Sequence, residues 1–105
     1  MAQPRIDIPI EKIAAFCRKW QITEFALFGS VLRDDFRPDS DVDVLITIAP
    51  GASLGLFELV EMRDELLYLF NRPVDIVTRW TIEHSENTSR QQHILESAEV
   101  IYAAA

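Results

Sequence analysis

The sequence predicts a mixed α/β or α+β fold, in which a small mixed β-sheet packs against helices. Segments with apolar residues at helical spacing alternate along the chain with short apolar runs that begin or end at Gly, Pro or Asp. The chain has 105 residues, of which 49% are hydrophobic, and this size suits one modest core. No stretch approaches the roughly 20 apolar residues of a membrane helix. We therefore expect a single domain over residues 1–105.

The first part of the chain predicts a helix, a strand and a short helix, in that order. Residues 9–20 begin at a proline, which can open a helix, and carry apolar side chains at helical spacing. Residues 23–28, TEFALF, are apolar and aromatic and end at a glycine, which is typical of a strand. We expect a short helix over residues 30–33, and the Pro, Asp and Ser content of residues 34–40 predicts a loop.

Residues 41–48, DVDVLITI, predict a second strand, because apolar side chains occupy every other position. One face of this strand is expected to carry Val42, Val44, Ile46 and Ile48, and the other Asp41, Asp43, Leu45 and Thr47. Two carboxylates on one face of a strand repel each other, and Asp is a poor strand former. The pair therefore needs a compensating interaction.

The second half of the chain predicts a helix, a strand, a helix and a final extended piece. A turn-rich connection over residues 49–55 precedes the strongest helix, residues 56–70, which ends before a proline. A short third strand is expected over residues 74–77, a last helix within about 86–97, and an extended or docking segment at 100–102. The apolar stripe of the strong helix is expected to comprise Leu56, Leu59, Val60, Leu66, Leu67 and Phe70.

Charge argues against nucleic-acid binding, and the cysteine content rules out an internal disulfide. The formal net charge is −7, whereas a protein that follows nucleic acid normally presents a basic face. We therefore expect no direct nucleic-acid partner. Cys17 is the only cysteine, so no internal disulfide can form, and its position on the apolar face of the first helix predicts an inert core residue. With no apolar leader and no membrane span, the expected location is the cytoplasm.

Three aspartates form the first candidate constellation. Asp41 and Asp43 lie two positions apart on the second strand, so their side chains project from one face about 6.6 Å apart along the strand. Asp75 lies in the third strand, between a valine and an isoleucine. If these strands are neighbours, the three carboxylates converge, and a divalent cation removes their repulsion. Oxygen ligands of this kind suit Mg²⁺ or Mn²⁺.

Gly29 and Ser30 form the complementary candidate, a phosphate site. Glycine allows a phosphate to approach the backbone, and Ser30 offers a hydroxyl and an N–H group. The start of the following short helix adds further oriented N–H groups. A phosphate site opposite a metal site predicts that a nucleoside triphosphate binds here, where paired metals could activate an attacking oxygen and stabilise departing pyrophosphate.

With ten residues between Ser30 and Asp41, the pattern Gly-Ser, then Asp-x-Asp, resembles the signature of the DNA polymerase β–type nucleotidyltransferase superfamily. The fuller context, LFGSVLR, then DSDVDVLI and later RPVDIV, is most similar to its minimal nucleotidyltransferase branch. The resemblance covers about residues 9–102 and implies the catalytic palm fold alone. Members of this branch are often encoded beside a HEPN-domain partner.

The resemblance implies roles for four residues around the phosphates. Gly29 and Ser30 would hold the triphosphate. Arg33 and Arg37 match arginines often found in this loop, where they contact phosphates or the partner, although plain surface charges are the simpler interpretation. One departure concerns residues 34–35, because the family commonly has Gly after the first of these arginines and this chain has two aspartates. If those acids face the triphosphate, they weaken ATP binding.

The resemblance also implies a division of work among the three acids. Asp41 and Asp43 would ligate two Mg²⁺ ions, with Mn²⁺ as the alternative. Asp75 would ligate the catalytic metal and assist deprotonation of the acceptor hydroxyl. The three residues are therefore the predicted metal ligands and the predicted catalytic residues.

These implications lead to a first hypothesis and two rivals. The first is an antitoxin of a type VII-like pair, which transfers AMP from ATP to a hydroxyl of a HEPN toxin within a hetero-oligomer. The expected acceptor is a tyrosine. The acidic charge would speed its encounter with a basic toxin. The second is a catalytically weak antitoxin that neutralises its partner by binding alone. The third is a small-molecule nucleotidyltransferase, of the kind that modifies aminoglycosides.

Overall fold

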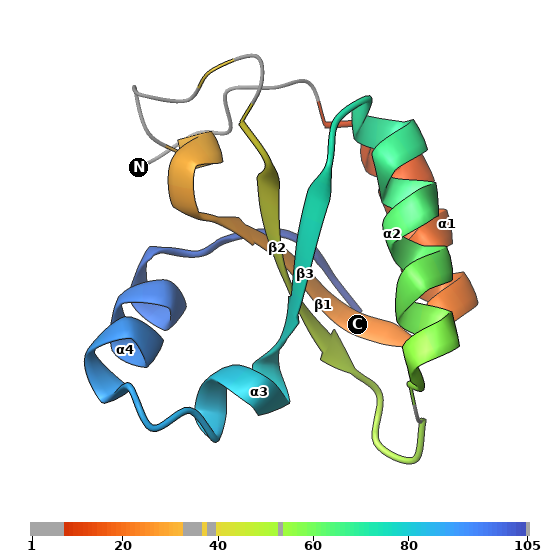
Figure 1. Ribbon diagram of the computed structural model, residues 1–105. Helices are drawn as coiled ribbons and strands as arrows, with labels where there is room; N and C mark the ends of the chain where they lie inside the picture. Colours follow the sequence, from red (N-terminus) through yellow and green to blue (C-terminus); the bar gives the residue numbers. More distant parts are fainter. Residues whose placement is uncertain (1–7, 33–36, 38–39, 53, 105) are drawn as a thin grey trace.

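The computed structural model describes residues 8–32, 37, 40–52 and 54–104 (Figure 1). Helices and strands alternate along this part of the chain. In order they are α1 (Ile10–Trp20), β1 (Ile22–Phe28), the 3-10 helix η1 (Gly29–Leu32), β2 (Val42–Ile48), α2 (Leu56–Phe70), β3 (Val74–Thr78), α3 (Arg79–Glu83), α4 (Thr88–Ser97) and β4 (Glu99–Ala103). No helix in the described ranges has the length and apolar character needed to cross a membrane.

The four strands form one mixed sheet in the order β3-β2-β1-β4. β1 pairs with β2 and with β4 in antiparallel fashion, whereas β2 and β3 are parallel. The parallel pair is joined through α2, which returns the chain to the start of the sheet as a βαβ crossover does. The predicted small mixed sheet packed with helices is therefore confirmed.

Helices cover the two faces of the sheet unequally. In Figure 1, α1 and α2 lie side by side against one face, while α3 and α4 lie against the other. The larger core lies under α1 and α2 and includes Ile13, Phe16, Cys17, Phe25, Leu27, Val42, Val44, Ile46, Met62, Leu66 and Phe70. The smaller core lies under α3 and α4 and comprises Ala26, Phe28, Leu45, Ile82 and Ile94, with Val77, Leu95 and Ala98 packed against it.

The alternation predicted for the second strand is confirmed. Val42, Val44 and Ile46 are fully buried toward α1 and α2, and Leu45 packs into the smaller core on the opposite face. The face that carries Asp43 is therefore the face that α3 and α4 cover only in part. This leaves the beginning of the strand accessible.

The predicted bounds of α2 are confirmed, but half of its predicted apolar stripe is wrong. Leu56, Val60 and Leu67 are exposed, with 75%, 47% and 45% of their surface accessible. The helix instead buries Met62 and Leu66 completely. The buried face advances in steps of three and four residues through Leu59, Met62 and Leu66, and then from Leu66 to both Leu69 and Phe70. Several phases fit a helix this rich in apolar residues, and the direction of the crossover selects one.

The C-terminal region contains one helix that the sequence did not predict, whereas the expected last helix and the expected extended segment are present as α4 and β4. A short helix, α3, follows β3 directly and is capped by Thr78, whose hydroxyl accepts a hydrogen bond from the Thr81 N–H (3.2 Å). Trp80 of this helix is 67% exposed and stacks on His84, because α3 turns it away from the sheet. The final extended segment is a true strand, β4, at the edge next to β1.

Candidate functional site

Asp43 and Asp75 lie opposite each other in the parallel pair of strands. The register of β2 and β3 pairs Asp43 with Asp75, between the pairs Val42–Val74 and Val44–Ile76. Paired residues of neighbouring strands are about 4.8 Å apart and project from the same face of the sheet. Asp43 is half-buried and Asp75 is exposed. The topology therefore brings together two carboxylates that are 32 positions apart in the sequence.

Asp41 directly precedes β2, two positions before Asp43, and its side chain is exposed. Within the described ranges, no three acidic, His or Cys side chains form a ready metal-binding cluster. The predicted convergence of three carboxylates is therefore seen only for the Asp43–Asp75 pair. A pair nevertheless suits Mg²⁺, which is usually held by one or two carboxylates and completes its shell with water and substrate phosphates.

Gly29 brings the backbone against the Asp43 carboxylate. Its φ of +77° lies in the left-handed region, and Phe28 before it is paired with Asp43 across β1 and β2. A Cβ atom at this position would overlap the Oδ2 atom of Asp43. Only glycine allows the chain to turn here at this distance from the acid. The half-buried Ser30 follows as the second residue of η1, so it is next in the chain to the glycine that meets the Asp43 carboxylate.

The loop arginines are placed only in part. Arg33 lies outside the described residues, as do the two acids at 34–35. The side chain of Arg37 is exposed, and its backbone closes a turn with Ser40: the Arg37 N–H donates to the Ser40 Oγ (3.0 Å), and the Ser40 N–H donates to the Arg37 carbonyl (3.0 Å).

Arg72 is a residue of this region that the sequence reasoning did not single out. It lies between α2 and β3, and its Nη1 atom donates to the carbonyls of Arg37 (3.2 Å) and Ser40 (3.3 Å). Its position two residues before the Val-Asp of the third strand was the available signal. Its contacts, however, form only because β2 pairs with β3, and no local sequence pattern predicts that pairing.

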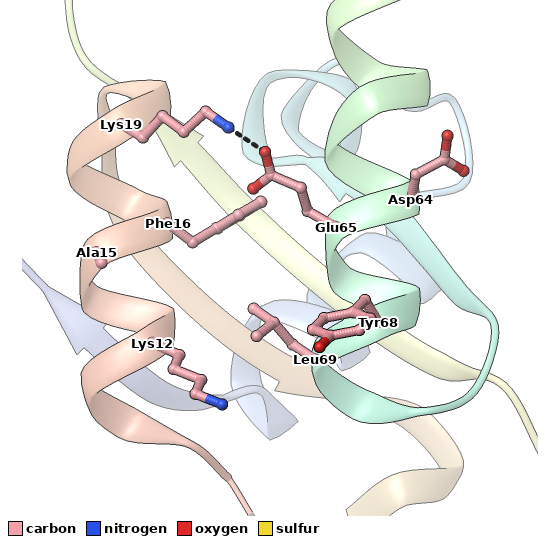
Figure 2. A pocket seen from close by; sticks show the side chains of 8 residues that line it. All are labelled: Lys12, Ala15, Phe16, Lys19, Asp64, Glu65, Tyr68 and Leu69. Atoms are coloured by element: carbon pink, nitrogen blue, oxygen red, sulfur yellow. Dashed lines mark hydrogen bonds and ion pairs between the residues drawn. The ribbon is translucent and has the colours of Figure 1, made fainter.

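A groove of about 560 Å³ lies elsewhere, between α1 and α2 (Figure 2). Phe16 of α1 and Leu69 of α2 point into it, and the ion pair of Lys19 with Glu65 spans it at one end. This groove belongs to the helical layer, on the face of the sheet away from Asp43 and Asp75. The two sites are therefore separate, and the groove does not serve the carboxylate pair.

Cys17 takes no part in either region. It lies on the buried face of α1, and this burial raises the pKa of its thiol to about 12, while the charge of Arg18 acts in the opposite direction. The thiol therefore stays protonated at neutral pH and is a poor nucleophile. This agrees with the expectation of an inert core residue.

Sequence comparisons identify relatives over most of the chain. Residues 10–101 match the family described as the Nucleotidyltransferase domain. Two proteins of Methanocaldococcus jannaschii, for which protein adenylyltransferase activity is proposed, are similar to this chain. MJ0435 is 31% identical over 67 residues, which are 64% of this chain and 70% of that protein. MJ1217 is 32% identical over 66 residues, which are 63% and 65% of the two chains.

Solved structures share the fold. The structure of a proposed minimal nucleotidyltransferase has a TM-score of 0.65 and 26% identity to this chain, and the match covers 85% of each chain. A toxin–antitoxin structure with AMP-PNP has a TM-score of 0.69 and 18% identity over 92% of this chain and 75% of the other. A complex of the tri-AMPylated HEPN toxin of Shewanella oneidensis with an MNT antitoxin has a TM-score of 0.61 and 20% identity over 90% and 70%.

Proposed function

Because this chain belongs to the nucleotidyltransferase domain family, we propose that it transfers AMP from ATP to a hydroxyl group of a partner protein. The observation that carries the proposal is the register that pairs Asp43 with Asp75, on the face of the sheet that α3 and α4 cover only in part. The tight turn at Gly29 lies directly beside this pair. Carboxylates next to an open backbone turn suit a metal–triphosphate ligand, in which the phosphates approach N–H groups and the cation lies among the acids.

In this proposal each residue of the site has a stated task. Gly29 and Ser30 receive the triphosphate, because the glycine leaves room beside the backbone and the serine offers its hydroxyl and N–H. Asp41, Asp43 and Asp75 would hold the Mg²⁺ ions. When bound, the ions neutralise charge on the phosphates and on the departing pyrophosphate.

The transfer requires one proton acceptor in the protein. The oxygen of the acceptor hydroxyl attacks the α-phosphorus of ATP, the bond from that phosphorus to the bridging oxygen of the β-phosphate breaks, and pyrophosphate leaves. The hydroxyl proton passes to the carboxylate of Asp75, which is the more exposed member of the Asp43–Asp75 pair. An exposed position suits this role, because the acceptor arrives from solvent on a partner protein.

The proposed partner is a HEPN-domain toxin, and its modified group is a tyrosine hydroxyl. Two observations support this choice: fold relatives occur in toxin–antitoxin structures, one of them with an AMPylated HEPN toxin, and the M. jannaschii relatives carry a proposed protein adenylyltransferase activity. The net charge of −7 would favour encounter with a basic ribonuclease. The protein would then act as the antitoxin of the pair in a hetero-oligomer.

The experiment incubates the purified protein with α-labelled ATP, Mg²⁺ and a HEPN-domain protein from the same organism. We expect label on the HEPN protein with the wild-type chain and its loss in Asp43→Asn and Asp75→Asn. Glu86→Gln is the matched control, because it also removes one exposed carboxylate, in the connection between α3 and α4. Mass spectrometry of the labelled protein then identifies the modified residue.

Neutralisation without transfer is the competing result. If the Asp43→Asn and Asp75→Asn variants still suppress the ribonuclease activity of the partner and no label is transferred by the wild type, the protein acts by binding alone. That outcome contradicts the proposal. Label that appears on an aminoglycoside instead of the protein would contradict it in favour of a small-molecule substrate.

A further inference from the structure

The Arg72 side chain connects the two strands that carry the acids. Its Nη1 atom donates to the carbonyl of Arg37 (3.2 Å) and to the carbonyl of Ser40 (3.3 Å). Ser40 directly precedes Asp41, and Arg72 itself stands three positions before Asp75. One guanidinium therefore links the backbone at the entrance of β2 to the backbone at the entrance of β3.

The groups that Arg72 contacts are themselves held in place. The turn between Arg37 and Ser40 is closed by two 3.0 Å hydrogen bonds, one in each direction. Next to it, the Val42 N–H donates to the Pro73 carbonyl (3.0 Å), which begins the pairing of the two strands. Arg72 thus extends the ladder of β2 and β3 beyond its last pair, at the end of the sheet where the acids lie.

We propose that Arg72 is a positioning residue, which holds Asp41 and Asp43 in register with Asp75 so that the acids can share a metal ion. The inference rests on the metal site of the proposed function. Strand pairing alone tolerates fraying at the end of a ladder, and a shift of one position would turn an acid to the opposite face. The bonds to both ends of the Arg37–Ser40 turn oppose such fraying where Asp41 leaves the loop.

The geometry suits arginine at this position better than lysine. One nitrogen of a planar guanidinium can donate two hydrogen bonds in fixed directions, whereas a lysine ammonium is a compact charge on a flexible stem. Arg72 is also half-buried, so its orientation is held by the surrounding chain. Lysine at this position is expected to keep the charge but to lose part of the alignment.

The test measures metal binding directly, with Mn²⁺ as the probe. Free Mn²⁺ gives a six-line electron paramagnetic resonance signal that falls when the ion binds. Because ATP itself binds Mn²⁺, the titration is made without nucleotide, and the fall in signal then reports binding of the ion to the protein alone. Loss of a group that orients metal ligands typically weakens binding or activity 10- to 100-fold. We expect Arg72→Met to weaken Mn²⁺ binding by about tenfold or more, and Arg72→Lys to lie between it and the wild type.

The matched control is Arg63→Met, which removes an exposed arginine from the middle of α2. A second measurement, amide hydrogen exchange at Val42, reports opening at the start of β2. We expect faster exchange at Val42 in Arg72→Met, with unchanged exchange at the buried Ile46 on the same strand. If Arg72→Met does not fold, the same two readouts on Arg72→Lys decide.

Three outcomes are possible. Weaker Mn²⁺ binding together with faster exchange at Val42 supports the inference. Wild-type Mn²⁺ affinity in a folded Arg72 variant overturns it and leaves the proposed function standing, provided that Asp75→Asn loses binding. Absence of Mn²⁺ binding by the wild-type protein overturns both.

Discussion

At the scale of single residues, Gly29 allows the backbone to turn directly beside the carboxylate of Asp43. Its φ of +77° disfavours any side chain, and a Cβ atom there would also overlap the carboxylate of Asp43. Gly51 has a similar φ of +85°, but a Cβ atom added there would meet nothing within 4 Å. A substitution at Gly51 therefore measures the cost of the backbone conformation alone. The same substitution at Gly29 adds the cost of a steric overlap with the Asp43 carboxylate.

Gly29→Ala is expected to destabilise the protein more than Gly51→Ala does. Both variants incur the left-handed strain of about 1–2 kcal/mol. Gly29→Ala adds a steric conflict, which we expect to cost about 1–3 kcal/mol more. Urea unfolding measures both differences, and AMP transfer is expected to fall only in Gly29→Ala. Equal losses of stability in the two variants would show that Asp43 does not approach the backbone at Gly29.

At the scale of secondary structure elements, α2 shows how a helix can be predicted correctly and oriented wrongly. The helix is rich in apolar residues on several sides, including Phe57 and Tyr68, which are both 83% exposed. Its orientation follows from the crossover between β2 and β3, which presses one particular face against the sheet. Leu66 and Leu67 are neighbours in sequence but differ in environment, since one is fully buried and the other is 45% exposed.

Alanine substitutions at these two leucines test that orientation. Leu66→Ala removes a completely buried side chain and is expected to lower the free energy of unfolding by about 2–5 kcal/mol. Leu67→Ala is expected to cost about 1 kcal/mol or less, because the side chain is already partly in water. Chemical denaturation of both variants provides the measurement. The reverse order of losses would mean that the helix is rotated relative to this structure.

At the scale of the whole molecule, binding of metal and nucleotide at the strand entrances is expected to stabilise the entire fold. The proposed ligands come from β2 and β3, while Gly29 and Ser30 follow β1, so a bound ligand would bridge the central part of the sheet. A ligand that binds only the folded state at about 100 times its Kd adds roughly 2.7 kcal/mol. Because a small domain unfolds in one cooperative transition, this added free energy raises the melting temperature of the whole fold.

Thermal unfolding with Mg²⁺ and ATP measures this effect. For a protein of about this size, each kcal/mol raises Tm by roughly 4–8 °C, so we expect an increase of roughly 10 °C or more at saturating ligand. ATP with a chelator, or Mg²⁺ and ATP with Asp75→Asn, is expected to raise Tm much less. An equal rise in wild type and Asp75→Asn would place the nucleotide away from the carboxylate pair.

Local patterns predicted most of the elements because their signals are local. The alternation in DVDVLITI, the helical spacing before Trp20 and the Gly-Ser turn after TEFALF all act within a few residues. The structure bears out these elements, with bounds that differ by one or two positions, and the family match supports the resemblance drawn from them. Trp80 and α3 escaped prediction because a five-residue helix capped by Thr78 carries too weak a pattern.

The chain itself thus determined the type and order of the main elements, the chemistry of the candidate residues and the family to which they point. Only the tertiary structure decided that β2 and β3 are neighbours in parallel register, that Asp43 faces Asp75, and that Arg72 reaches the turn before Asp41. The physical reason is the range of the interactions. Backbone preferences and side-chain periodicity act along the chain, whereas register arises from packing both layers of helices against the sheet at once.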